Sequence, residues 1–220
     1  MRTKKVLRII GAVLAIFVGL YPFIYFFVDR KFGLLQSKND TVLTNVFWNT
    51  GFYVHITLGG IALLIGWTQF SVKLRKRKLK LHRQIGKVYV IAALLSSLTS
   101  VYIALYATGG IIASLGFMCL GIIWFYTTFR AYIEIKNGQI ENHQQMMIYS
   151  YAACFSAVTL RIYLPILVML FHDFIKAYLV VSWLCWIPNI IVAYFLVRQL
   201  QKQKVKIAIN KIIYARGAGL

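Results

Sequence analysis

The chain has very little negative charge. Only five of its 220 residues are Asp or Glu, against 25 Lys and Arg, and the formal net charge is +20. Proton- or sodium-coupled carriers usually place ionisable groups on the path of the ion, so the absence of carboxylates from the long apolar runs argues against such a carrier. All five acidic residues are expected in or beside loops: Asp29, Asp40, Glu134, Glu141 and Asp173.

The sequence also lacks the common catalytic motifs. It has no paired carboxylates for acid–base catalysis, no Walker-type or glycine-rich dinucleotide loop, and no nucleophile beside a base. Its three cysteines, Cys119, Cys154 and Cys185, fall within apolar runs and lack the spacing of a disulfide or zinc motif. These absences favour a protein that is not an enzyme, and they leave a channel or a redox protein open.

Apolar residues dominate what is present. The chain is 60% hydrophobic and 14% charged, with a mean hydropathy of +0.71, whereas soluble proteins are about half apolar and a quarter charged. A membrane helix needs about 20 apolar residues. Six runs are long enough, at roughly 7–28, 47–71, 86–107, 111–130, 146–170 and 176–197. We therefore predict an all-α fold, an integral membrane bundle of six transmembrane helices in a single polytopic domain.

The first run resembles a signal peptide only superficially. Basic residues precede it, but its apolar stretch is longer than usual and no clear cleavage site comes before Asp29. We interpret it as a retained span.

The basic residues predict the orientation. With the N-terminus in the cytoplasm, 20 of the 25 Lys and Arg fall on the cytoplasmic side, four fall outside, and Arg161 alone lies within a span. Such a bias over short loops indicates that both termini are cytoplasmic. We expect a multi-pass protein of the bacterial cytoplasmic (plasma) membrane.

Two basic segments suggest partners. The cluster Lys73–Lys80 is a topology anchor that can also bind anionic lipid headgroups. The basic tail, residues 198–220, is expected to be an interfacial helix or disordered. We expect no nucleic-acid partner, and the sequence predicts no oligomeric state.

Four histidines and one intramembrane arginine remain as candidates for function. His55 shares a helical face with small residues and Gln69, so it is expected to hydrogen-bond within the bundle or to bind a ligand. His82, followed by Arg83, and His143 are expected at similar depth at the inner interface. They would hold a haem iron or a metal, contact lipid phosphates, or cap helices.

Arg161 is the most informative candidate. It lies about ten residues from the outer end of the fifth span, with no carboxylate in the membrane to pair with it. Pro165 leaves the carbonyl of Arg161 without its usual helical donor. We hypothesise that Arg161 and His55 share a site, with Tyr163 and Gln69 as further ligand-binding candidates. Snorkelling of Arg161 to the outer surface is the alternative.

Several motifs together resemble a known family. They are His55-x-x-x-Gly59, Gly66-Trp67-x-Gln69-Phe70, His82-Arg83-x-x-Gly86-x-x-Tyr89 and Thr159-Leu160-Arg161-x-Tyr163-Leu164-Pro165. Their order and spacing resemble the bacterial multi-pass membrane family called domain of unknown function 2306, from about Phe52 to Pro165. The resemblance implies a fold and a membrane location, but no established activity.

The sequence is compatible with three functions. The leading hypothesis is a membrane protein that binds a small ligand, a lipid or a partner through its intramembrane His and Arg side chains. The second is a haem- or metal-binding redox protein, because the chain loosely resembles b-type cytochromes; this implies at most one haem b, held by His82 and His143. The third is a facilitated transporter with a path past Arg161.

Overall fold

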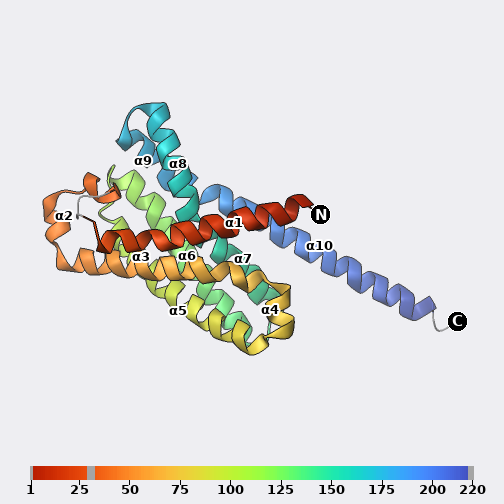
Figure 1. Ribbon diagram of the computed structural model, residues 1–220. Helices are drawn as coiled ribbons and strands as arrows, with labels where there is room; N and C mark the ends of the chain where they lie inside the picture. The colour runs from red at the N-terminus through yellow and green to blue at the C-terminus, as the bar shows by residue number, and fades with distance from the viewer. Residues whose placement is uncertain (1, 29–32, 218–220) are drawn as a thin grey trace.

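The computed structural model describes residues 2–28 and 33–217, and every regular element in these two segments is helical. Figure 1 shows long helices running side by side, with the start of the first helix and the end of the last helix on the same side of the picture. The helices are α1 (Arg2–Leu20), α2 (Asp40–Thr44), α3 (Val46–Gly66), α4 (Val72–Arg77), α5 (Leu79–Ala104), α6 (Ile111–Lys136), α7 (Ile140–Cys154), α8 (Ser156–Phe171), α9 (Phe174–Leu184) and α10 (Ile187–Gly217), with short 3-10 helices at Tyr21–Phe26, Gly33–Ser37 and Trp67–Phe70.

Six helical segments of the described residues are long and apolar enough to span a membrane, which confirms the predicted six-span, all-α fold. They are Ile9–Phe26, Val46–Phe70, Leu79–Ala104, Ile111–Lys136, Ile140–Phe171 and Phe174–Lys206. Several helices extend beyond the predicted spans into polar sequence. The helix of the third span begins at Leu79, so His82 lies within it.

The core of the bundle is a ring of four helices. Helix α3 packs along α5, α5 along α6 and α6 along α7, while α1 lies against α3. We call the side that carries α2 the α2 end and the side that carries α4 the α4 end (Figure 1). Helices α1, α5 and α7 begin at the α4 end, whereas α3 and α6 begin at the α2 end.

Glycines allow the helices to approach closely. A Cβ on Gly60 would lie 2.7 Å from the carbonyl oxygen of Gly19 in α1, and a Cβ on Gly116 would lie 2.9 Å from the carbonyl oxygen of Ser182 in α9. Small residues at such contacts are typical of membrane helices, where close packing replaces the hydrophobic effect between helices.

The interior of the ring contains a hydroxyl network. The hydroxyls of Tyr89 and Ser150 are 2.8 Å apart, and those of Ser150 and Thr128 are 2.7 Å apart. All three residues are fully buried, and they come from α5, α7 and α6. Because lipid offers no hydrogen bonds, this network satisfies polar groups that would otherwise be costly.

Two spans are broken. The fifth divides at Phe155 between α7 and α8, and the sixth divides at Cys185 and Trp186, just before Pro188. At the second break, Pro188 lacks the backbone N–H that a continuous helix would use for a hydrogen bond. Beyond the bundle, α10 continues as a helix to Gly217 and projects away from the other helices (Figure 1).

Candidate functional site

Arg161 lies in α8, which contacts α1. Its guanidinium carbon is 4.7 Å from the centre of the Tyr21 ring, an arrangement that stabilises a cation over an aromatic face. Tyr25, one helical turn further along the same 3-10 helix, is also within electrostatic range. The first span therefore provides the aromatic surface against which Arg161 packs.

The guanidinium of Arg161 is only partly hydrogen-bonded within the described residues. Its Nη1 donates to the carbonyl oxygen of Ala157 at 3.0 Å. Its Nε is buried and has no partner among the described residues, and no carboxylate in those residues pairs with the side chain. Nε and Nη2 form the side-on fork with which arginine holds a carboxylate or phosphate.

His55 links α3 to α5. Its Nδ1 lies 3.0 Å from the carbonyl oxygen of Ser96, which can only accept, so Nδ1 carries the proton. The Ser96 hydroxyl donates back to the carbonyl oxygen of His55 at 2.8 Å. The positive charge of Arg161 acts on His55, but no hydrogen bond joins the two side chains among the described residues. Whether they share a ligand stays a prediction.

The other two ligand-binding candidates, Tyr163 and Gln69, lie in different surroundings. Tyr163 packs partly buried in an apolar cluster with residues of α6 and α9. Gln69 is buried near the α4 end, where its Oε1 faces α5 at 3.3 Å from the position of a Cβ on Gly86. Although Gln69 shares a helical face with His55, it lies at the other end of the same span, closer to His82 than to His55.

His82 and His143 both lie at the α4 end, near the starts of α5 and α7. The Nδ1 of His143 donates to the carbonyl oxygen of Ala131 at 2.7 Å, so its Nε2 is the basic nitrogen. The Nδ1 of His82 is buried and has no partner among the described residues. Arg83, next to it, is exposed.

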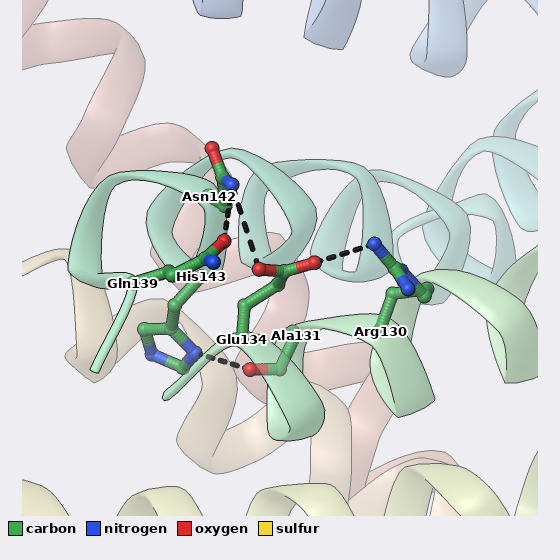
Figure 2. A network of polar contacts seen from close by, with 6 residues as sticks. All are labelled: Arg130, Ala131, Glu134, Gln139, Asn142 and His143. Atoms are coloured by element: carbon green, nitrogen blue, oxygen red, sulfur yellow. Dashed lines mark hydrogen bonds and ion pairs between the residues drawn. The ribbon is translucent and has the colours of Figure 1, made fainter. Parts of the chain in front are cut away.

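A buried carboxylate lies beside His143, and the sequence interpretation missed it. Figure 2 shows Glu134 between Arg130 and Asn142, while His143 turns to the carbonyl of Ala131. Glu134 Oε1 is 2.6 Å from Arg130 Nη2, and Oε2 accepts from Asn142 Nδ2 at 3.4 Å.

Glu134 lies near the end of α6, beside a loop as expected, but its burial was not predicted. Its side chain is 6% exposed, because α6 continues six residues past the predicted end of the fourth span and packs against α7. Its spacing of four residues from Arg130 was the available signal for an ion pair within a helix.

No group of three or more His, Cys, Asp or Glu side chains that could hold a metal ion occurs in the described part of the chain. His82 and His143 alone would be two nitrogen ligands. The cysteines add none, since Cys154 and Cys185 are buried in apolar clusters.

Lys38 at the α2 end gives a prediction for pH. Its ammonium group donates to the carbonyl oxygen of Tyr106, and burial lowers its pKa from 10.5 to about 8. Between these values the unfolded chain binds more protons than the folded one, so stability should rise with pH from about 8 to 10.5. After allowance for solvent screening, we expect a gain of about 1 kcal/mol, or roughly 2–4 °C in Tm.

Thermal unfolding of the detergent-purified protein at several pH values measures this gain. Lys38→Met should abolish the rise of Tm with pH that Lys38 causes. Lys176→Met, at an exposed lysine paired with Asp173, should leave the dependence of Tm on pH as in wild type. An unchanged slope in Lys38→Met would show that Lys38 does not titrate as inferred.

The chain matches a known protein family. A family model described as "Predicted membrane protein (DUF2306)" matches residues 52–197, which is well over half of the chain and includes His55, His82, His143 and Arg161. No curated protein and no solved structure matches the chain.

Proposed function

The chain belongs to the DUF2306 family of predicted membrane proteins, and we propose that it binds an anionic amphiphile whose head group pairs with Arg161. The head group is a carboxylate, as in a fatty acid, or a phosphate, as in an anionic lipid. We further propose that both termini are cytoplasmic in a bacterial plasma membrane, as the distribution of basic residues favours. Arg161 then lies in the outer half of the bilayer.

The observation that carries this proposal is the Nε of Arg161, which has no hydrogen-bond partner among the described residues. A charged side chain within a membrane is costly and normally pairs with another group. Here Tyr21 covers one face and Ala157 accepts one hydrogen bond, while Nε has no partner among the described residues. An anion at the Nε–Nη2 fork would supply the missing charge and two hydrogen bonds together.

The surroundings of Arg161 favour a ligand with an apolar tail. Large apolar side chains are exposed next to it, namely Leu20, Phe23 and Ile24 around Tyr21, and Ile162 and Ile166 on α8. In a bilayer these side chains contact acyl chains. A ligand that reaches Arg161 between them must present apolar surface to lipid, which a small water-soluble anion does not.

Ligand-dependent thermal unfolding tests the proposal. We expect oleate or dioleoyl-phosphatidylglycerol to raise the Tm of the delipidated protein in detergent, and dioleoyl-phosphatidylcholine to have little effect, because a ligand that binds only the folded state stabilises it. Comparison of oleate with phosphatidylglycerol distinguishes the carboxylate source from the phosphate source.

Substitutions locate the effect. Arg161→Gln should weaken binding by about tenfold or more, since hydrogen bonds to charged groups contribute roughly 1.5–3 kcal/mol. Arg198→Gln is the matched control, because Arg198 also packs over a tyrosine, Tyr194 at 5.0 Å, but on the exposed surface of α10. Equal stabilisation of wild type and Arg161→Gln by the anionic ligands would refute the proposal.

A further prediction separates ligand binding from a structural role. Without ligand, Arg161→Gln should be at least as stable as wild type, because the substitution removes a desolvated charge that no described carboxylate compensates. Chemical unfolding of delipidated protein measures this. A loss of several kcal/mol would instead indicate that Arg161 holds the fold together.

A further inference from the structure

The side chain of Asn189 connects the two broken spans at their breaks. It comes from the start of α10 and faces the junction of α7 with α8. Its Nδ2 lies 2.9 Å from Thr159 Oγ1, 3.2 Å from the carbonyl oxygen of Cys185, and 3.4 Å from both Ser156 Oγ and the carbonyl oxygen of Ala152. One amide therefore contacts the end of α7, the first turn of α8 and the segment that joins α9 to α10.

Thr159 is the nearest of these partners. Its side chain is buried, and its hydroxyl donates to Asn189 Oδ1 at 3.2 Å while it accepts from Nδ2. An amide nitrogen has two hydrogens and cannot serve four acceptors at once. We therefore expect the two-way contact with Thr159 to be the strongest that Asn189 makes.

The backbone alone does not fix how α8 is turned about its axis. Helix α7 ends at Cys154 and α8 begins at Ser156. Between them the N–H of Val158 bonds to the carbonyl oxygen of Phe155 at 2.9 Å, which is a tighter turn than an α-helix makes. Residues at such helix ends can absorb changes in backbone angles. Side-chain contacts are therefore needed to set the rotation of α8.

Helix α10, which carries Asn189, is itself held to the ring. Gln201 Nε2 donates to Gln145 Oε1 of α7 at 3.1 Å, and Lys204 pairs with Glu141 of α7 at 2.8 Å. Asn189 therefore holds α8 against a pair of helices whose mutual position is set by other contacts.

The rotation of α8 decides where Arg161 points. Thr159 and Arg161 are two residues apart, so their side chains leave the helix about 200° apart, on nearly opposite faces. While Thr159 faces Asn189, Arg161 faces the first span, where its guanidinium carbon lies 4.7 Å from the centre of the Tyr21 ring.

We propose that Asn189 is a positioning residue for the Arg161 site and that it acts through Thr159. It does not contact the ligand. It holds the first turn of α8 so that the guanidinium lies over Tyr21 and its Nε–Nη2 fork is available to the anion. The expected effect on ligand affinity rests on the proposed function, whereas the expected effect on the rotation of α8 does not.

Two substitutions of Thr159 separate its hydroxyl from its shape. Thr159→Val removes the hydroxyl and keeps the branched shape, whereas Thr159→Ser keeps the hydroxyl. We expect Thr159→Val and Asn189→Ala each to weaken the binding of oleate or dioleoyl-phosphatidylglycerol by about tenfold, and Thr159→Ser to bind as wild type does. Equilibrium binding to delipidated protein in detergent measures this, at a temperature where circular dichroism shows every variant folded.

Two controls separate positioning from a loss of stability. In the Arg161→Gln background, Thr159→Val should cause no further loss of affinity, because a positioning residue acts only through the guanidinium. Ser150→Ala removes a buried hydroxyl that bonds to Tyr89 and Thr128 in the ring. It should lower stability and leave the affinity for the anionic ligand unchanged.

A distance measurement tests the rotation of α8 without a ligand. Phe17 of α1 and Ile166 of α8 are exposed, and Cys154 and Cys185 are buried. With Cys119 replaced by serine, Phe17→Cys and Ile166→Cys each take one spin label. Pulsed electron paramagnetic resonance should then give a shifted or broader distance distribution in Thr159→Val, and the unshifted distribution in Thr159→Ser.

The inference and the proposed function fail in different ways. If wild type binds neither oleate nor phosphatidylglycerol, the proposed function fails, and the distance measurement alone decides whether Asn189 and Thr159 position α8. An unchanged distance distribution in Thr159→Val would overturn the inference whether or not a ligand binds. Where wild type does bind, so would undiminished affinity in Thr159→Val, or an equal loss with and without Arg161, and both results leave the proposed function standing.

Discussion

Gly66→Ala is expected to destabilise the protein strongly. A Cβ at Gly66 would lie 2.5 Å from Cε2 of Tyr151 and 2.8 Å from Cε2 of Tyr89. Neither ring can move freely: Tyr89 is fully buried and hydrogen-bonded to Ser150, and Tyr151 donates to the carbonyl oxygen of Leu63 at 3.3 Å. Overpacking of this kind costs about 1–3 kcal/mol, and broken hydrogen bonds add to it.

Gly11→Ala provides the matched control. Gly11 also lies within a helix, α1, but a Cβ there would meet nothing within 4 Å. Because alanine favours helix over glycine by roughly 1 kcal/mol, this variant should be as stable as wild type or slightly more stable. Denaturant unfolding in detergent, followed by circular dichroism, compares the two. Equal stability of both variants would show that α3 is not packed this tightly against the tyrosines.

The second large effect is expected from Ser150→Ala. The buried hydroxyl of Tyr89 shares a hydrogen bond of 2.8 Å with the hydroxyl of Ser150. Thr128 keeps its bond to the carbonyl oxygen of Trp124 at 2.7 Å, so the substitution leaves chiefly the tyrosine unsatisfied. An unsatisfied buried hydroxyl costs about 1–3 kcal/mol.

A double-mutant cycle makes this prediction specific. Tyr89→Phe removes the stranded hydroxyl, so Ser150→Ala combined with Tyr89→Phe should cost less than the sum of the single substitutions. Thr50→Ala is the control, since Thr50 is exposed and its hydroxyl only bonds back to Val46 at 2.9 Å in its own helix. Strict additivity of the two substitutions would argue against the network.

The sequence predicts the spans because hydropathy depends only on residues near each other along the chain. The same information predicts Arg161 as an unusual charge within a span. It does not predict that Tyr21 covers its guanidinium, since this contact joins the first span to the fifth and depends on how each helix is rotated. The spacing of Tyr21 and Tyr25 by one turn is the only local trace of that surface.

The α4 end shows the same limit. The sequence places His82 and His143 at similar depth, and in the structure both lie near the helix starts at the α4 end. Arg75 is partly buried within a run of otherwise exposed basic residues, and Glu134 is buried beyond the predicted end of its span. Hydropathy treats all of these as loop residues, because burial of a short polar segment by a neighbouring helix leaves no mark in composition.

Native mass spectrometry of the protein released from mixed micelles that contain oleate, phosphatidylglycerol and phosphatidylcholine tests the central claim most directly. The proposed function predicts that wild type and Arg198→Gln each retain one anionic amphiphile, and that Arg161→Gln does not. Retention of the same amphiphile at the same occupancy by Arg161→Gln would contradict it.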